Sequence, residues 1–96
     1  MLQTIISAIK NRQVLSLTYK GIHRIVEPHT AGVSKKGHDV LSCYQTQGSH
    51  IKPGHEWDLL TVSKISNLSA TGDLFSGTRP GYARNDSRMT RIYAEI

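Results

Sequence analysis

The first eleven residues carry apolar side chains at helical spacing. Leu2, Ile5, Ile6 and Ile9 recur every three or four positions, so they fall on one stripe of a helix whose other face is polar. The sequence therefore predicts a helix over residues 2–11. A helix of about ten residues is not stable alone in water, so its isoleucine face must pack against the rest of the chain.

After residue 12 the apolar period changes to two, which is typical of β-strands. The predicted strands cover residues 13–19, 22–30, 38–47, 57–62 and 65–70. Lys20-Gly21 and residues 34–37 predict turns, and residues 47–55 predict an exposed loop. Pro28 has no N–H for a ladder, so we expect an edge, a bulge or a bend there. Residues 38–47 are apolar on both faces, which predicts a central strand.

Residues 76–96 differ from the rest of the chain. Residues 76–86 contain glycine and proline without periodicity, which predicts an extended arm. Asn85 or Asp86 can cap a following helix. The apolar stripe of that helix would consist of Met89, Ile92, Tyr93 and Ile96. The stripe needs a cover, and the sequence allows either the chain's own sheet or a neighbouring subunit.

A length of 96 residues allows one core and is too short for two. We therefore expect a mainly β (α+β) fold. Residues 1–75 would form a small five-stranded barrel with its N-terminal helix, because closure removes the edges of short strands. Residues 76–96 would add the arm and an amphipathic helix. A core this small gives marginal stability, so a homodimer formed through the arm and the C-terminal helix is a reasonable expectation.

The chain carries twelve Lys and Arg against seven Asp and Glu, a formal net charge of +5. The excess lies at the two ends, while residues 37–76 carry more acidic than basic side chains. This distribution allows an anionic ligand or a nucleic acid. It equally allows oppositely charged surfaces of two copies to associate.

The only cysteine, Cys43, excludes an intramolecular disulfide framework and a cysteine-rich zinc site. A single cysteine is typical of proteins from a reducing cytoplasm. The N-terminal apolar residues follow no basic stretch and end at Lys10 and Arg12. We therefore expect neither a signal peptide nor a membrane span, and a cytoplasmic protein.

The pattern Tyr19-x-Gly21-x-x-Arg24-x-Val26-x-Pro28, with the helix and strand before it, resembles the opening of the WYL domain family. Further along, Gly37–Leu41 corresponds to the stretch that names this family, and Trp57–Ile65 to its late strand. Two positions depart from the family pattern. Asp39-Val40-Leu41 stands where the family has Trp-Tyr-Leu, and Asp58 stands where an arginine is frequent.

The resemblance implies an SH3-like or Sm-like β-barrel. WYL domains are usually regulatory parts of bacterial transcription factors or of CRISPR accessory proteins, and they are thought to bind nucleic acid or nucleotide-like effectors. This chain would then be a stand-alone WYL-like domain from a bacterial cytoplasm. The loss of the arginine at Asp58 weakens a ligand site inherited from the family.

Arg24 is the first candidate for binding an anion. It shares a strand face with Ile22 and Val26, and in that apolar setting a guanidinium binds phosphate or carboxylate strongly. The alternative is an internal ion pair with Glu56 or Asp58. Three aromatic residues near it could stack on a base, although such residues more often belong to a core. These are Tyr19, Tyr44 and Trp57.

Further basic residues could contact phosphates, with each contact adding about −0.7 to −0.9 to the log–log salt slope of binding. Lys35 and Lys36 lie in a predicted turn, where lysines are more often simply solvated. Arg88 and Arg91 lie on the polar face of the predicted C-terminal helix, with Arg79 and Arg84 before it. This face too is more often solvated than bound.

Histidines and the cysteine do not assemble a reactive site. His23 and His29 share a strand face but are about 20 Å apart along it, too far for one metal ion. His50 and His55 lie in the predicted loop. Cys43 is expected to be a buried structural thiol. The sequence thus offers no catalytic residues, no metal site and no cofactor motif.

Two hypotheses follow from the sequence. In the first, the chain is a non-enzymatic regulatory or sensing domain that binds nucleic acid or a nucleotide-like effector, with Arg24 at its centre. In the second, it is a protein interaction or oligomerisation module without a small ligand.

Overall fold

The computed structural model describes residues 1–49 and 54–96; of the predicted loop 47–55, residues 50–53, including His50, lie outside this part. The chain begins with helix α1, Leu2–Asn11. The strands are β1 (Gln13–Tyr19), β2 (Ile22–Ser34), β3 (Asp39–Gly48), β4 (Trp57–Thr61), β5 (Ile65–Leu74) and β6 (Met89–Glu95). A 3-10 turn, η1 (Val62–Lys64), joins β4 to β5. The predictions of a helix over residues 2–11 and of a mainly β fold are therefore confirmed.

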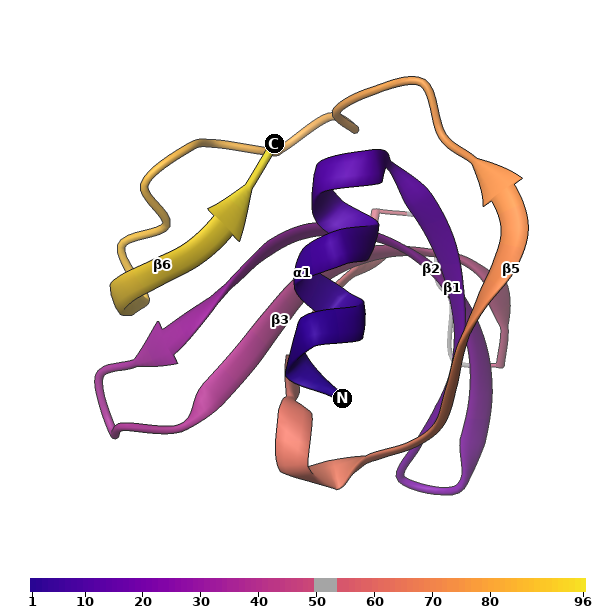
Figure 1. Ribbon diagram of the computed structural model, residues 1–96, viewed down its shortest axis with the longest axis horizontal. Helices are drawn as coiled ribbons and strands as arrows, with labels where there is room; N and C mark the ends of the chain where they lie inside the picture. Colours follow the sequence, from indigo (N-terminus) through magenta and orange to yellow (C-terminus); the bar gives the residue numbers. More distant parts are fainter. Residues whose placement is uncertain (50–53) are drawn as a thin grey trace.

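All strand pairs of the sheet are antiparallel, and their order is β4-β3-β2-β1-β5. The long strand β2 organises the sheet. It pairs with β3 along one edge, while its other edge pairs first with β1 and then with β6. Figure 1 shows the strands curling around α1, with β6 on one side of the helix and β5 on the other. The predicted central position of the third strand is confirmed, because β3 lies between β2 and β4.

The hairpin between β1 and β2 has the tightest possible connection. Tyr19 pairs with Ile22, so only Lys20 and Gly21 form the loop. Both have positive φ, 53° and 74°, as a type I′ turn requires. This turn matches the right-handed twist of the flanking strands, which explains why the Lys-Gly dipeptide closes the hairpin. The predicted irregularity at Pro28 is also present as a register shift between β2 and β3.

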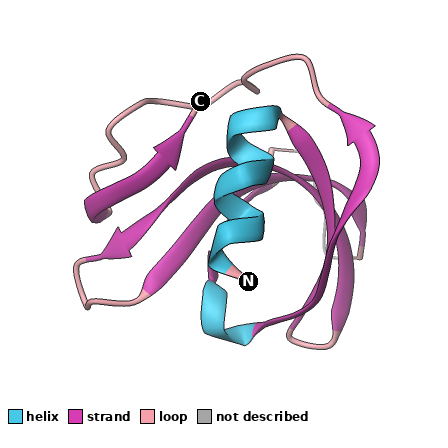
Figure 2. Cartoon of the chain, viewed as in Figure 1, coloured by secondary structure: helices cyan, strands magenta, loops and turns pink. Residues whose placement is uncertain are grey.

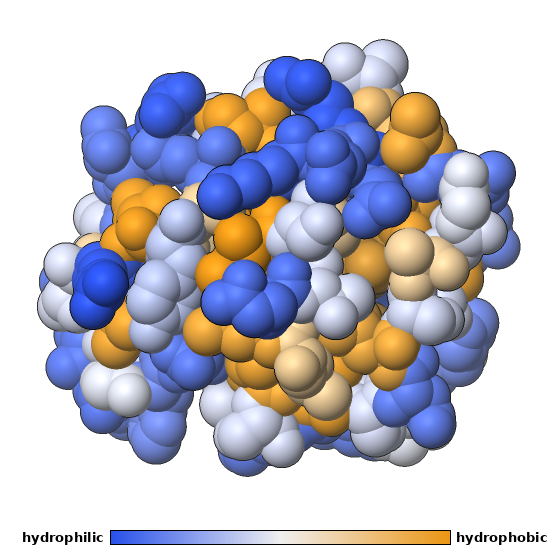
Figure 3. Space-filling model, in the orientation of Figure 1, coloured by the Kyte–Doolittle hydropathy of each residue, from blue (hydrophilic) through white to orange (hydrophobic). Residues whose placement is uncertain are grey.

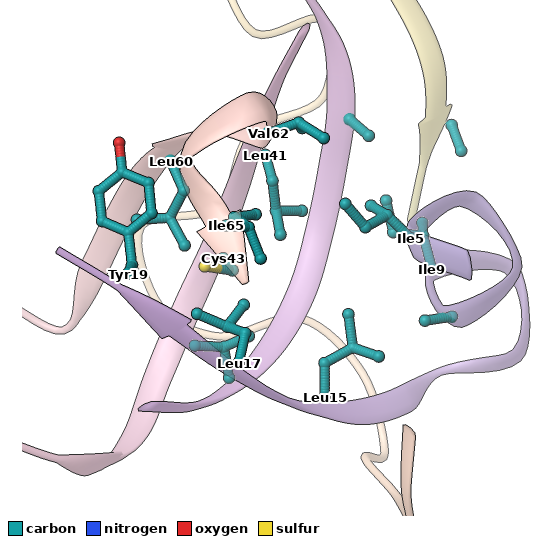
Figure 4. Close-up of a cluster of buried hydrophobic side chains, with 14 residues drawn as sticks. Ile5, Ile9, Leu15, Leu17, Tyr19, Leu41, Cys43, Leu60, Val62 and Ile65 are labelled. Atoms are coloured by element: carbon teal, nitrogen blue, oxygen red, sulfur yellow. The ribbon is translucent and has the colours of Figure 1, made fainter. Parts of the chain in front are cut away.

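Helix α1 packs its isoleucine face against the concave side of the sheet. Ile5, Ala8 and Ile9 are buried, and Arg12 ends the helix in the left-handed conformation with φ 52°. Figure 4 shows side chains of the helix and of the sheet meeting in one cluster, with Ile5 and Ile9 at one end and Tyr19 at the other. Each fully buried aliphatic side chain contributes about 1.5–3 kcal/mol, so this face holds the short helix in place.

The predicted C-terminal helix is wrong: Met89–Glu95 is a strand, so the sheet has six strands in the described residues rather than five. The helical spacing of Ile92 and Tyr93 has another cause. Ala31 pairs with Ala94 but Gly32 pairs with Ile92, so Tyr93 is an extra residue that shifts the alternation of β6. Without β6, the backbone N–H and C=O groups along one edge of the second half of β2 would have no partners. This need for pairing outweighs the local helical pattern of residues 89–96.

Strand β5 is also longer than predicted, reaching Leu74 rather than residue 70.

On the face drawn in Figure 3, polar side chains gather over its upper part, while apolar atoms show lower down, around the N-terminal end of α1. Ile6 and Leu68 are partly buried and pack against the core. Among the described residues, none of the helices combines the length and the apolar character needed to span a bilayer.

Candidate functional site

The segment between β5 and β6, residues 75–88, forms the predicted extended arm. In Figures 1 and 2 it runs as a loop along the top of the view, from the end of β5 to the start of β6. Its first residue is tied to the body of the protein, because the Phe75 N–H donates to the Arg12 carbonyl at 2.9 Å. Its last turn is closed by the Met89 N–H, which donates to the Asp86 carbonyl at 3.1 Å. The arm is therefore part of the fold and crosses the β2–β3–β4 region.

A Pro-Gly turn seats the arm on the sheet. The Tyr82 N–H donates to the Arg79 carbonyl at 3.2 Å, with Pro80 and Gly81 at the corner. Gly81 has φ 93°, which a type II turn demands of its third residue. The turn exposes the Pro80 carbonyl, and the indole N–H of Trp57 donates to it at 2.8 Å. The arm is thus joined to β4 by a hydrogen bond to the backbone of the turn.

Arg79 forms the strongest polar link between the arm and the sheet. Its Nε and Nη2 donate to the two carboxylate oxygens of Glu27 at 2.7 and 2.9 Å, a bidentate pair. The Glu27 side chain is only 8% exposed, so this acid on β2 is covered by its partner. The hydrogen bond to Glu27 raises the pKa of Arg79. The guanidinium also lies 4.8 Å from the centre of the Tyr44 ring.

His29 lies fully buried beneath the turn of the arm. Its Nδ1 lies 2.9 Å from the Glu27 carbonyl, and its Nε2 accepts the Arg79 N–H at 3.2 Å. These two contacts assign the proton to Nδ1, because a carbonyl only accepts and an amide only donates. The rings of Trp57, Phe75 and Tyr82 surround the imidazole at 4.8–5.5 Å between centroids. Burial is the main cause that lowers the pKa of His29.

A pocket of about 320 Å³ opens between the arm and the sheet. Its walls are Thr30, Ser42, Trp57, Gly81, Tyr82, Ala83, Asp86 and Arg88. The rings of Trp57 and Tyr82 lie nearly parallel, with centroids 6.4 Å apart. The pocket thus offers an aromatic surface, three hydroxyl groups, one carboxylate and one guanidinium, which is the mixture typical of a small-molecule site.

The guanidinium of Arg88 is oriented by Asp86. Nε and Nη2 donate to the two Asp86 carboxylate oxygens at 2.9 and 2.6 Å, and Nη2 also reaches the Ser42 hydroxyl at 3.5 Å. The hydrogen bond from Arg88 lowers the pKa of Asp86. In the part of the chain that the structure describes, Nη1 of Arg88 has no hydrogen-bond partner, and half of the side chain is exposed. Its remaining donors can therefore bind an anion in the pocket.

Arg24, the first candidate from the sequence, has an internal partner. Its Nη1 lies 3.3 Å from Asp58 Oδ2 and 3.4 Å from Gln45 Oε1, and the side chain is buried. The ion pair with Asp58 is one of the two internal pairs considered above, and Glu56 instead accepts the Gly54 N–H. Arg24 does not line the pocket under the arm. The geometry therefore favours a structural role for Arg24 over contact with a ligand.

The three candidate aromatic residues have different surroundings. Tyr19 belongs to the core, and its hydroxyl accepts the Thr61 N–H at 3.1 Å. Tyr44 lies under Arg79 and packs edge-on against Trp57 at 5.5 Å. Of the three, only Trp57 lines the pocket. The alternative of a core residue therefore fits Tyr19, while Trp57 remains a candidate for stacking.

The remaining basic candidates separate into two places. Arg88 lines the pocket. Lys35 and Lys36 are both exposed at the turn between β2 and β3. Arg91 lies close to that turn, because it pairs with Val33 near the end of β2, and its guanidinium lies 5.5 Å from the Tyr93 ring. The structure thus brings Lys35, Lys36 and Arg91 to one end of the sheet, and none of the three lines the pocket.

Sequence reasoning missed the role of the residues that hold the arm in place, and it considered three of them only for phosphate contact, helix capping or metal binding. The residues are Glu27, His29, Arg79, Tyr82 and Asp86. One signal was present. Glu27 and His29 flank Pro28 inside a strand that is otherwise largely apolar, and buried polar residues need partners. The partner of both lies some fifty residues away, which no local pattern reveals.

The histidines and Cys43 form no reactive group in the described residues. No cluster of three or more His, Cys, Asp or Glu side chains with the geometry to hold a metal ion occurs there. His23 is exposed and hydrogen bonded to Ser16, whereas His29 is buried. Cys43 is fully buried, as predicted, and burial raises the pKa of its thiol far above the ordinary value.

Comparison of the chain with models of protein families, with curated proteins and with solved structures finds no match. The resemblance to the WYL family therefore stays a prediction.

Proposed function

We propose that the chain is a non-enzymatic regulatory or sensing domain that binds a small, nucleotide-like anion in the pocket between the arm and the sheet. One observation carries this proposal: Arg88 and the Trp57 and Tyr82 rings line the same pocket. A nucleotide presents a flat base and a charged phosphate, and these are the two chemistries that the pocket offers.

The pocket gives each part of such a ligand a partner. The phosphate would accept from Nη1 of Arg88, whose other donors are held by Asp86 and Ser42. The hydroxyls of Thr30 and Ser42 would bond to polar atoms of the sugar or base. The base would lie against the exposed surface of Trp57 or Tyr82. The volume of about 320 Å³ is at the small end for ligand sites and suits a single nucleotide rather than a polymer.

We also propose that the sheet forms the SH3-like or Sm-like barrel expected from the sequence. The strand order β4-β3-β2-β1-β5 and the short 3-10 turn between β4 and β5 support an SH3-like arrangement. A link to bacterial transcription regulation follows from the resemblance alone, and a cytoplasmic location from the single cysteine and the resemblance. The proposed dimer cannot use a C-terminal helix, because the tail is a strand that pairs with β2 of its own chain.

The test compares two arginine variants of the arm. Binding of adenosine monophosphate, inorganic phosphate and a short single-stranded oligonucleotide is measured by isothermal titration calorimetry. We expect Arg88→Gln to weaken nucleotide binding about tenfold or more, since a hydrogen bond to a charged group contributes about 1.5–3 kcal/mol. Arg84→Gln is the matched control, because Arg84 pairs with Glu95 and does not line the pocket.

Each outcome has a distinct meaning. Nucleotide binding that Arg88→Gln weakens and Arg84→Gln leaves unchanged supports the proposal. Equal loss in both variants, or no nucleotide binding by the wild-type chain, overturns it. If the chain binds only the oligonucleotide, and Lys36→Gln weakens this binding as much as Arg88→Gln does, the function belongs to the basic end of the sheet at Lys35, Lys36 and Arg91.

A further inference from the structure

His29 connects the position of the arm to the shape of the pocket. Its ring packs against Trp57 and Tyr82, and both of these line the pocket. The same ring holds the start of the Pro-Gly turn through the Arg79 N–H. A change at His29 is therefore transmitted to the turn and to the aromatic surface of the pocket together.

Both ring nitrogens of His29 are occupied in the neutral form. Nδ1 donates to the Glu27 carbonyl, and Nε2 accepts from Arg79. A second proton could bind only at Nε2, where it would meet the N–H of Arg79 instead of an acceptor. Protonation of Nε2 thus breaks its hydrogen bond with the Arg79 N–H, and two N–H donors then face each other where the arm meets β2.

The surroundings of His29 oppose a positive charge. The ring is fully buried, so water cannot solvate an imidazolium. The titratable or charged groups that face it are Glu27 from β2 and Arg79 and Tyr82 from the arm. Trp57 and Phe75, at the starts of β4 and the arm, are uncharged. The Glu27 carboxylate is already bound at both oxygens by Arg79, so it offers little compensation.

We propose that protonation of His29 releases the Pro-Gly turn of the arm and opens the pocket, so that the bound anion is held at neutral pH and released in acid. The release is local. Farther along the arm, Arg84 binds Glu95 and Arg88 binds Asp86, and these pairs do not involve His29. The turn itself is also held by the Arg79–Glu27 pair and by the indole of Trp57, so its release requires the charge on His29 to outweigh both ties, while the end of the arm stays on the protein. The consequence for ligand release rests on the proposed function, whereas the opening of the arm does not.

The first experiment observes the ligand-free, full chain. Nitrogen-detected NMR of ¹⁵N-labelled histidines follows His29 from pH 7.5 to 5.5, together with the amide signals of Arg79, Gly81 and Tyr82. Fluorescence of Trp57, the only tryptophan, is recorded in parallel. At pH 7.5 we expect the His29 ring to be neutral, with its single proton on Nδ1. The amide signals and the fluorescence should then change with the same midpoint as the His29 ring.

Two variants separate His29 from general acid effects. In His29→Gln the amide signals and Trp57 fluorescence should no longer change over this pH range. His23→Gln removes an exposed histidine that does not touch the arm, and it should behave like the wild type. If His29→Gln does not fold, the wild-type titration decides alone. A His29 that titrates without any change in the arm, or that stays neutral down to pH 5.5 whether or not the arm changes, overturns the proposal.

The ligand experiment is kept separate. Binding of adenosine monophosphate should weaken more from pH 7.5 to pH 5.5 in the wild-type chain than in His29→Gln, because the ligand phosphate titrates near pH 6 in both proteins and only the wild type also takes up the proton on His29. Arm opening without any nucleotide binding would reject the proposed function and leave this inference intact. Nucleotide binding that is unaffected by a demonstrated opening would reject the link between the arm and the pocket.

Discussion

At the scale of the residue, the role of each arginine depends on the partner that the fold supplies. Arg24 sits among apolar neighbours on β2, and Asp58 of β4 neutralises it. A buried guanidinium without this acid would be costly, so the substitution of one partner alone should be strongly destabilising. Arg88 is also paired, with Asp86, but half of its side chain stays exposed and the residue lines the pocket. Exposure, and not residue type, separates the structural arginine from the binding candidate.

Gly81 makes a sharp prediction at this scale. Its φ is 93°, and an added Cβ would lie 3.0 Å from Nε1 of Trp57. Gly81→Ala therefore introduces backbone strain of about 1 kcal/mol and also disturbs the indole hydrogen bond to Pro80. We expect a lower free energy of unfolding in urea and a shift of the Trp57 emission maximum.

The matched control is Gly72→Ala. Gly72 has nearly the same φ, 94°, but an added Cβ would meet nothing within 4 Å. Gly72→Ala should lower the free energy of unfolding only by the backbone strain and should leave the Trp57 emission maximum unchanged. Equal effects of the two substitutions on stability and emission would contradict the proposed seating of the arm on Trp57.

At the scale of the element, β2 is the strand on which the fold depends. It is long enough to pair with β1 and then with β6 on the same edge, while β3 covers its other edge. The period of two identified the strands of the first half of the chain, and their turns carry local signals such as Lys20-Gly21. The strand β6 has no such signal, because the extra residue Tyr93 gives it helical spacing. Only the unpaired edge of β2 explains its conformation.

Gly32 tests the pairing of β2 with β6. An added Cβ there would collide with the carbonyl oxygen of Arg91 and lie 2.8 Å from Sδ of Met89. Backbone cannot move aside as a flexible side chain can, so Gly32→Ala should detach part of β6. We expect a loss of roughly 2 kcal/mol or more in the free energy of unfolding, in the range of overpacked cores.

Gly77→Ala is the control for this substitution. Gly77 has no positive φ, and an added Cβ would meet nothing within 4 Å. The control should leave the urea midpoint within the small range usual for surface changes. A Gly32→Ala protein as stable as the control would show that β6 does not need close contact with β2.

At the scale of the whole molecule, internal ion pairs neutralise part of the positive charge of the arginines. Arg24, Arg79, Arg84 and Arg88 each bind one carboxylate in the described residues. The formal excess of +5 therefore rests on the lysines and the remaining arginines. Lys35, Lys36 and Arg91 gather at one end of the sheet, where they give the protein a basic surface distinct from the pocket.

The buried His29 makes the stability of the whole molecule depend on pH. Burial lowers its pKa in the folded chain, while in the unfolded chain it titrates near 6.5. Below pH 6.5 the unfolded chain thus binds more protons, and the free energy of unfolding should fall as the pH drops from 6.5 towards the folded pKa. The slope is at most about 1.4 kcal/mol per pH unit for one proton.

Two aspartates act at lower pH, with opposite signs. Hydrogen bonds from Arg88 lower the pKa of Asp86, so its contribution is lost as the pH falls below 3.8. Burial raises the pKa of Asp58, so its protonation favours the folded chain and offsets part of that loss. Urea unfolding at pH 7.5, 6.5 and 5.5 isolates the histidine. Stability that does not fall over this range, or falls equally in His29→Gln, would contradict the assignment.

The sequence by itself determined the helix, the strands up to β5, the buried thiol and the mainly β class, because these follow from short-range periodicity and from turn residues that need particular φ angles. Only the tertiary structure decided that the tail is a strand and that Arg24 pairs with Asp58. It also decided that a pocket lies between the arm and the sheet. The physical reason is the same in each case: buried ladder edges and buried charges must find partners, and here those partners lie thirty or more residues away along the chain.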